Sequence, residues 1–160
     1  MTQPFDFAQK VAIIAGGTGG LGSALRNELE AKGCVVASIS RSHPSSSSHI
    51  TADLRSPEAA TTALAEAIAR HGSVDIVINA MGVVAFGPIN TTSVDTVEEL
   101  FLTNTFGHIF LMQAALQNMA QGSVLVGISG VIAEQNLPGM SVYGASKAAA
   151  RSFNEALGRE

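Results

Sequence analysis

Five glycines fall within seven residues, directly after a short apolar run, and this cluster restricts the fold more than any other feature of the chain. The run Val11–Ala15 is apolar and partly β-branched, which predicts a buried strand. The next residues, Gly16-Gly17-Thr18-Gly19-Gly20-Leu21-Gly22, fit both the Gly-x-Gly-x-x-Gly spacing and the wider Gly-x-x-x-Gly-x-Gly spacing. Leucines at positions 21, 25 and 29 predict that a helix over 21–32 starts within the glycine cluster.

A strand that turns sharply into a helix has physical reasons to use glycine. The turn requires a positive φ, the backbone must approach a pyrophosphate closely, and the helix must pack tightly on the strand. The helix start also aims free N–H groups and the positive end of its dipole at phosphates. A tight structural turn is the alternative for glycines alone, but the flanking strand and helix favour dinucleotide binding. No Gly-Lys-Ser/Thr follows, which argues against a Walker-type ATP loop. The predicted phosphate cradle comprises Gly16, Thr18, Gly19, Gly20, Leu21 and Gly22.

Apolar runs and helical patterns alternate along the rest of the chain. This rhythm is typical of parallel strands joined by right-handed helical crossovers. We therefore predict a single domain over residues 1–160 with a doubly wound, three-layer α/β/α (Rossmann) architecture, whose ligands bind at the carboxyl ends of the strands. Further strands are expected at 35–40, 74–79 and 123–129, a polar loop at 42–49, and helices at 56–71, across 94–120 (two) and from near Ser141 onward.

Composition supports this fold class and excludes several functions. The 160 residues are 46% hydrophobic and 14% charged, which suits a sheet covered on both faces. The net charge of −4 without a basic stripe argues against nucleic acid as a partner, and no apolar stretch reaches the roughly 18 residues of a membrane span. A single cysteine cannot form an internal disulfide, and the first residues show no basic-then-apolar leader pattern. We expect a cytoplasmic protein.

The end of the second predicted strand indicates the cofactor. Proteins that bind NAD usually place Asp or Glu there, about 20 residues past the glycine loop, to bind the ribose 2′-hydroxyl. This chain has Ser40-Arg41-Ser42 instead. No carboxylate repels a 2′-phosphate, and the Arg41 guanidinium is suited to bind one. The alternative is that Arg41 points into water. The sequence favours NADP over NAD.

The glycine loop and four motifs that follow it resemble, by their order and spacing, the short-chain dehydrogenase/reductase family along nearly the whole chain. The wider glycine spacing is similar to that family's cofactor loop. Asp53-Leu54 resembles the pair whose acidic side chain meets the adenine amine. Asn79-Ala80-Met81-Gly82 resembles the Asn-Asn-Ala-Gly string, with Met81 where alanine is usual. The remaining two are Thr103-Asn104-Thr105-Phe106-Gly107, similar to the helix that carries a catalytic asparagine, and Tyr143-Gly-Ala-Ser-Lys147.

Tyr143 and Lys147 suit acid–base chemistry because residues four apart share one face of a helix. A phenol is a poor acid or base at neutral pH, and a neighbouring ammonium favours its deprotonated form. The resemblance implies hydride transfer between NADP(H) and a carbonyl or alcohol, with Tyr143 as general acid or base assisted by Lys147. It also implies that Lys147 holds the nicotinamide ribose and that Asn104 helps a water connect Lys147 to solvent.

The expected catalytic serine is displaced in this sequence. The family usually places a serine thirteen residues before the tyrosine, where it polarises the substrate carbonyl, and that position here is Gly130. Ser129 is adjacent, but neighbouring residues of a strand point to opposite faces. Ser129 serves only if the strand has ended or a bulge turns it.

Family members usually continue through further strands that supply most of the substrate pocket. The resemblance therefore implies five parallel strands in the order 3-2-1-4-5, without the last strands, and a homo-oligomer formed through the helices around Asn104 and Tyr143. The chain is either a shortened member or part of a longer protein.

Two other readings stay open. The displaced serine and the short C-terminal part are compatible with a non-catalytic NADP(H)-binding sensor or scaffold. A structural subunit that pairs with a complete homologue is less favoured because the cofactor residues are intact.

The four histidines show no metal-ligand spacing, so we predict no metal site and expect solvated or helix-capping roles for them.

Overall fold

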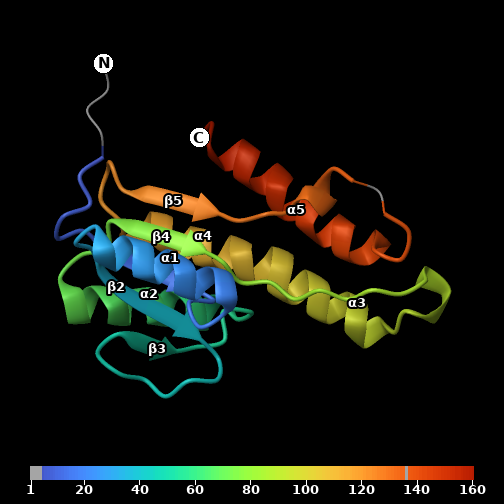
Figure 1. Ribbon diagram of the computed structural model, residues 1–160, viewed down its shortest axis with the longest axis horizontal. Coiled ribbons are helices and arrows are strands. Elements are labelled where there is room, and N and C mark those ends of the chain that lie inside the picture. The colour runs from blue at the N-terminus through green and yellow to red at the C-terminus, as the bar shows by residue number, and fades with distance from the viewer. Residues whose placement is uncertain (1–4, 136) are drawn as a thin grey trace.

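The computed structural model describes residues 5–135 and 137–160, so the first four residues of the predicted domain lie outside the described part. A five-stranded sheet lies at its centre, all its pairings are parallel, and its order is β3-β2-β1-β4-β5 (Figure 1). The predicted order is therefore confirmed. The strands are β1 (Val11–Ala15), β2 (Val35–Ser40), β3 (His49–Thr51), β4 (Ile76–Asn79) and β5 (Val124–Gly127).

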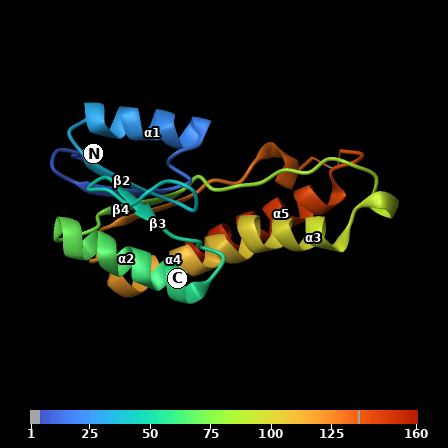
Figure 2. The ribbon, with the colours of Figure 1, turned by 90° about the horizontal axis from the view of Figure 1, so that it is seen from below.

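Helices cover both faces of this sheet. Figure 2 shows α1 on one face and α2, α4 and α5 on the other, while α3 extends past the sheet. The start and end of α2 follow from its sequence: the Ser56 hydroxyl accepts from Ala59 N, Pro57 is the first helical residue, and Gly72 ends the helix at φ +81°. The α-helices are α1 (Gly20–Ala31), α2 (Pro57–His71), α3 (Val94–Phe101), α4 (Gly107–Asn118) and α5 (Ser141–Leu157).

Side chains of β1 alternate between two apolar layers, as expected of a strand covered on both sides. Val11, Ile13 and Ala15 belong to the larger layer, which includes buried residues of α2 and α4. Ala12 and Ile14 belong to the smaller layer, which α1 covers. Cys34 is buried in that smaller layer, consistent with a small core residue.

The fourth strand starts at Ile76 rather than at residue 74, and three further differences from the sequence prediction bear on the site. The third strand is only three residues long and starts at His49, where the polar loop was expected to end. The fifth strand ends at Gly127, two residues before Ser129. The two helices expected across 94–120 are joined without a loop by the π-helical turn η2 (Leu102–Phe106). A π-turn inserts an extra residue per turn and is frequent at functional sites.

Candidate active site

The glycine turn is shaped by close approaches of the backbone. Gly16 has φ +77°, and a Cβ there would lie 2.9 Å from the Ala80 carbonyl carbon. A Cβ at Gly22 would overlap the Gly16 carbonyl oxygen and lie 2.6 Å from Gly17 Cα, whereas one at Gly20 would meet nothing within 4 Å. Gly16 and Gly22 therefore serve the turn itself, and Gly20 leaves open space at the start of α1. Gly19 caps that helix without a side-chain hydrogen bond, so no side chain at the cap occupies the first N–H groups, as suits a helix start that binds an anion.

A cleft of about 460 Å³ opens beside this turn, at the carboxyl ends of β1, β2, β3 and β4. Most residues predicted to bind the cofactor line it: Gly16, Thr18, Gly19, Ser40, Arg41, Asp53, Leu54, Ala80, Met81 and Gly82. Gly20, Leu21 and Gly22 form the first turn of α1 next to it. Tyr143 and Lys147 come from α5 instead. The position of the cleft agrees with ligand binding at the carboxyl ends of parallel strands.

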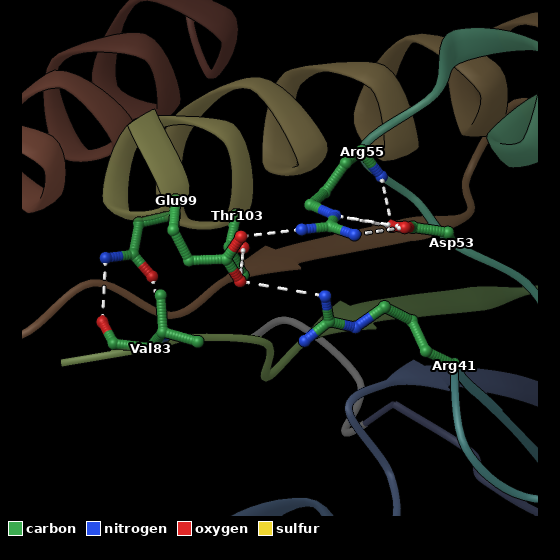
Figure 3. A network of polar contacts seen from close by, with 7 residues as sticks. Arg41, Asp53, Arg55, Val83, Glu99 and Thr103 are labelled. Atoms are coloured by element: carbon green, nitrogen blue, oxygen red, sulfur yellow. Dashed lines mark hydrogen bonds and ion pairs between the residues drawn. The ribbon is translucent and has the colours of Figure 1, made fainter. Parts of the chain in front are cut away.

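One end of the cleft carries a network of four charged side chains (Figure 3). Arg55 clamps the Asp53 carboxylate with Nε at 2.9 Å and Nη2 at 2.6 Å, and its Nη1 reaches Glu99 Oε2 at 2.6 Å. Arg41 Nη1 lies 3.6 Å from Glu99 Oε1, to which Thr103 Oγ1 donates at 3.2 Å. The hydrogen bonds from Arg55 lower the pKa of Asp53. The structure thus gives Arg41 an acidic neighbour that the sequence analysis did not identify.

Asn79 fixes the backbone where β4 enters the cleft. Its Oδ1 accepts from Met81 N at 2.9 Å, and its Nδ2 lies 2.7 Å from His108 Nδ1. His108 Nε2 in turn lies 2.6 Å from Asn154 Oδ1, so one chain of polar contacts, buried at Asn79 and His108, links β4, α4 and α5. Since the Asn154 oxygen only accepts, Nε2 carries the proton and Nδ1 accepts from Asn79. The solvated or capping roles expected for His108 and His49 are wrong, because these residues are 2% and 6% exposed.

Asn104 lies in the π-turn η2 and is fully hydrogen-bonded. Its Oδ1 accepts from Val83 N at 2.9 Å, and its Nδ2 donates to the Val83 oxygen at 2.9 Å and to Ser146 Oγ at 3.0 Å. Ser146 Oγ donates to the Tyr143 carbonyl, and Thr105 Oγ1 donates to the Ser146 carbonyl. Asn104 therefore joins the loop after β4 to the turn of α5 that carries Tyr143 and Lys147.

Lys147 is buried beside this junction. A Cβ at Gly82 would lie 3.1 Å from Lys147 Nζ and 3.5 Å from Asn104 Oδ1, which brings three predicted site residues together. Within residues 5–135 and 137–160, none of the ion pairs involves Nζ of Lys147. Burial lowers the pKa of Lys147. Tyr143 lies one turn earlier on α5 and lines a neighbouring pocket together with Thr96 and Gly139.

Ser129 lies outside β5, so the condition that the strand has ended is met. Its hydroxyl, however, donates to the Lys147 carbonyl at 3.1 Å. That bond uses the proton that a carbonyl-polarising serine would give to a substrate. Gly130 is extended, at φ −167° and ψ 158°.

Sequence reasoning missed Arg55, Glu99, His108 and Asn154. Arg55 and Glu99 are 44 positions apart, and His108 and Asn154 are 46 apart, so no local spacing marks either pair. For Arg55, proximity to Asp53 was the one available signal.

In the part of the chain that the structure describes, no helix is both long and apolar enough to cross a membrane.

Comparisons with known proteins agree with this geometry. The family model of the short-chain dehydrogenases matches residues 10–160. The hydroxynaphthalene reductase arp2 of Aspergillus fumigatus is 28% identical over 163 residues, which cover 92% of this chain and 59% of the reductase. The chain thus spans about three-fifths of that relative, and a similar share of two others.

Solved structures show the same fold. A short-chain dehydrogenase/reductase from Serratia marcescens superposes with a TM-score of 0.88 at 26% identity, covering 97% of this chain and 73% of that one. A short-chain dehydrogenase from Burkholderia cenocepacia in complex with NADP gives the same TM-score and identity, with 97% and 69% covered. Given the matched residues, the sheet order and the placement of the motifs, the chain belongs to the short-chain dehydrogenase family.

Proposed function

We propose that this chain is the cofactor-binding and proton-transfer part of an NADP(H)-dependent oxidoreductase acting on a small carbonyl or alcohol. The observation that carries the proposal is the position of Lys147. Its buried ammonium lies next to Gly82 and Asn104 and one helical turn from Tyr143. Burying a cationic group without a paired carboxylate costs free energy, so such a site is a strong sign of function.

The residues present fit a dinucleotide. The open space at Gly20 and the start of α1 suit the pyrophosphate, and Asp53 and Leu54 suit the adenine. Arg41 and Ser40 suit a ribose 2′-phosphate. The Burkholderia relative holds NADP, which supports NADP over NAD for this chain. When bound, the nicotinamide would supply or accept the hydride.

Tyr143 would give its phenolic proton to the substrate oxygen in reduction and take one in oxidation. The Lys147 ammonium would stabilise the negative charge that develops on the tyrosine oxygen. Because its pKa is lowered, Lys147 also releases a proton more readily than an exposed lysine does, which suits renewal of the tyrosine proton. Asn104 would position this pair through Ser146 and Val83.

The test is oxidation of NADPH, followed at 340 nm, with a panel of ketones and aldehydes. The names of the hydroxynaphthalene and versicolorin reductases among the relatives make these two compound classes the first additions to the panel. We expect turnover by the wild type and a loss of at least about 100-fold in Tyr143→Phe, the range ascribed to a general acid. Both proteins should bind NADPH equally. Equal turnover by Tyr143→Phe would refute the mechanism.

A non-catalytic NADP(H)-binding module is the second candidate function. Two observations favour it: Gly130 carries no hydroxyl, and the Ser129 hydroxyl is bonded to the Lys147 carbonyl. It predicts tight NADPH binding without turnover of any substrate on the panel.

We also propose self-association through the α3–η2–α4 helix and α5. Leu102, Phe106 and Leu116 are exposed large apolar side chains along this helix, at 37%, 45% and 54%. Contiguous exposed apolar surfaces frequently mark interfaces, and Leu102 and Phe106 lie four residues apart on this helix. Sedimentation analysis of the wild type and Phe106→Lys tests this, with a dimer or tetramer expected for the wild type and monomer for the variant.

A further inference from the structure

We propose that Glu99 competes with the ribose 2′-phosphate for Arg41 and thereby weakens the preference of this chain for NADP(H). This inference rests on the proposed function and concerns the end of the cleft where the 2′-phosphate would bind. Glu99 reaches this end from α3, while its cationic partners follow β2 and β3 (Figure 3). Glu99 is a positioning residue here, because it acts through Arg41.

The two arginines are held with very different strength. Arg55 uses Nε and Nη2 on Asp53 and Nη1 on Glu99, with contacts of 2.6 to 3.0 Å. Among the described residues, Arg41 pairs with Glu99 alone, at 3.6 Å, which is longer than a hydrogen bond, and its side chain is 48% exposed. Arg41 is therefore the cation that an incoming anion can recruit, and Arg55 is committed to Asp53.

The balance of charge makes Glu99 a competitor. Arg41 and Arg55 are matched by Asp53 and Glu99, so the network is neutral before a ligand binds. A 2′-phosphate brings close to two negative charges to a place where two carboxylates already lie. To bind Arg41, the phosphate must share the guanidinium with Glu99 or draw Arg41 away from it, because the Thr103 hydroxyl and Arg55 hold the Glu99 carboxylate in place.

A ribose that carries only hydroxyl groups behaves differently. It brings no charge, so it gains nothing from freeing Arg41 and meets no repulsion from Glu99. The pair Arg41–Glu99 therefore opposes NADP(H) binding and leaves NAD(H) binding unchanged.

The experiment compares Glu99→Gln with Glu98→Gln by calorimetric titration of the full chain with 2′,5′-ADP and with 5′-AMP. The two variants remove the same charge from adjacent positions of α3, but Glu98 is exposed and forms no ion pair within the described ranges. An exposed ion pair such as Arg41–Glu99 corresponds to about a two- to fivefold change in an equilibrium constant. We expect Glu99→Gln to bind 2′,5′-ADP about two- to fivefold more tightly and 5′-AMP unchanged, and Glu98→Gln to match the wild type in both.

A second pair of variants makes the test specific to Arg41. In an Arg41→Gln background, Glu99→Gln should improve 2′,5′-ADP binding less than it does beside Arg41, because only the direct repulsion between Glu99 and the phosphate is then left to relieve. If Glu99→Gln does not fold, Thr103→Val replaces it, since this variant removes the hydroxyl that holds Glu99 Oε1, and we expect a smaller gain in the same direction.

Two results would refute competition by Glu99 in a protein that still binds NADPH. Either the ratio of the dissociation constants for 2′,5′-ADP and 5′-AMP is the same in Glu99→Gln as in the wild type, or 5′-AMP gains as much affinity as 2′,5′-ADP. A wild type that binds neither NADPH nor NADH overturns the proposed function as well.

Discussion

Replacing Gly130 by serine tests whether the missing hydroxyl limits catalysis. Position 130 is extended backbone, which any residue adopts, and a Cβ there meets only Ile132 Cγ2 at 3.8 Å. Serine is therefore accommodated without displacing a neighbour, and we expect the free energy of unfolding to change by less than about 1 kcal/mol.

The size of the gain follows from the hydrogen bond that the new hydroxyl would donate. Removing a donor that stabilises a developing oxyanion typically costs about 2.7–4 kcal/mol of activation free energy. A newly introduced serine must be ordered into one rotamer, which costs about 1 kcal/mol. The remaining 1.7–3 kcal/mol corresponds to about a 20- to 150-fold rise in kcat.

The assay is steady-state NADPH oxidation with the ketone that the wild type reduces fastest, or with the whole panel if the wild type shows no turnover. Gly130→Ala adds the Cβ without the hydroxyl and should leave kcat unchanged. The double variant Gly130→Ser with Tyr143→Phe should be inactive, since the serine cannot supply the proton. If Gly130→Ser and Gly130→Ala have equal kcat values, the missing hydroxyl at position 130 does not limit the kcat of the wild type.

Three further predictions follow from the site. Gly22→Ala should lower the free energy of unfolding by several kcal/mol because its Cβ overlaps the Gly16 carbonyl, whereas Gly20→Ala should fold normally in urea titrations and lose NADPH affinity. Burial lowers the pKa of His108 in the folded protein. The neutral imidazole therefore stabilises the fold above the ordinary pKa of 6.5, and this stabilisation is lost as the pH falls below that value. His108→Gln should flatten the decline of Tm between pH 7 and pH 5. Ser129→Ala should cost about 1 kcal/mol of stability in the same titrations, through its lost bond to the Lys147 carbonyl, without reducing kcat; a large drop in kcat would restore Ser129 as the catalytic serine.

The glycine turn and the alternation of elements could be predicted from local patterns, whereas the sheet order was expected from the family resemblance. Helix α2 shows this: its serine cap, proline start and glycine end lie within the segment itself. The third strand was not located by residue, because His49–Thr51 is short, follows a serine-rich loop and gains its regularity only by pairing with β2. The early end of β5 at Gly127 also depends on tertiary context.

The candidate site also has a part that the sequence predicted and a part that only the tertiary structure reveals. Tyr143 and Lys147 are four residues apart, so their shared helix face could be predicted, and Gly82 and Asn104 prove to lie beside Lys147. The pairing of Arg41 with Glu99 could not be predicted, since it joins the end of β2 to α3 across the cleft. The buried His108 was misjudged because its partners come from β4 and α5.

Calorimetric titration of the wild type with NADPH and with NADH tests the central claim, that the cleft beside Gly16–Gly22 binds a dinucleotide with a 2′-phosphate. We predict one site per chain, tighter binding of NADPH than of NADH, and loss of that preference in Arg41→Gln. Absence of binding for both dinucleotides would contradict the account.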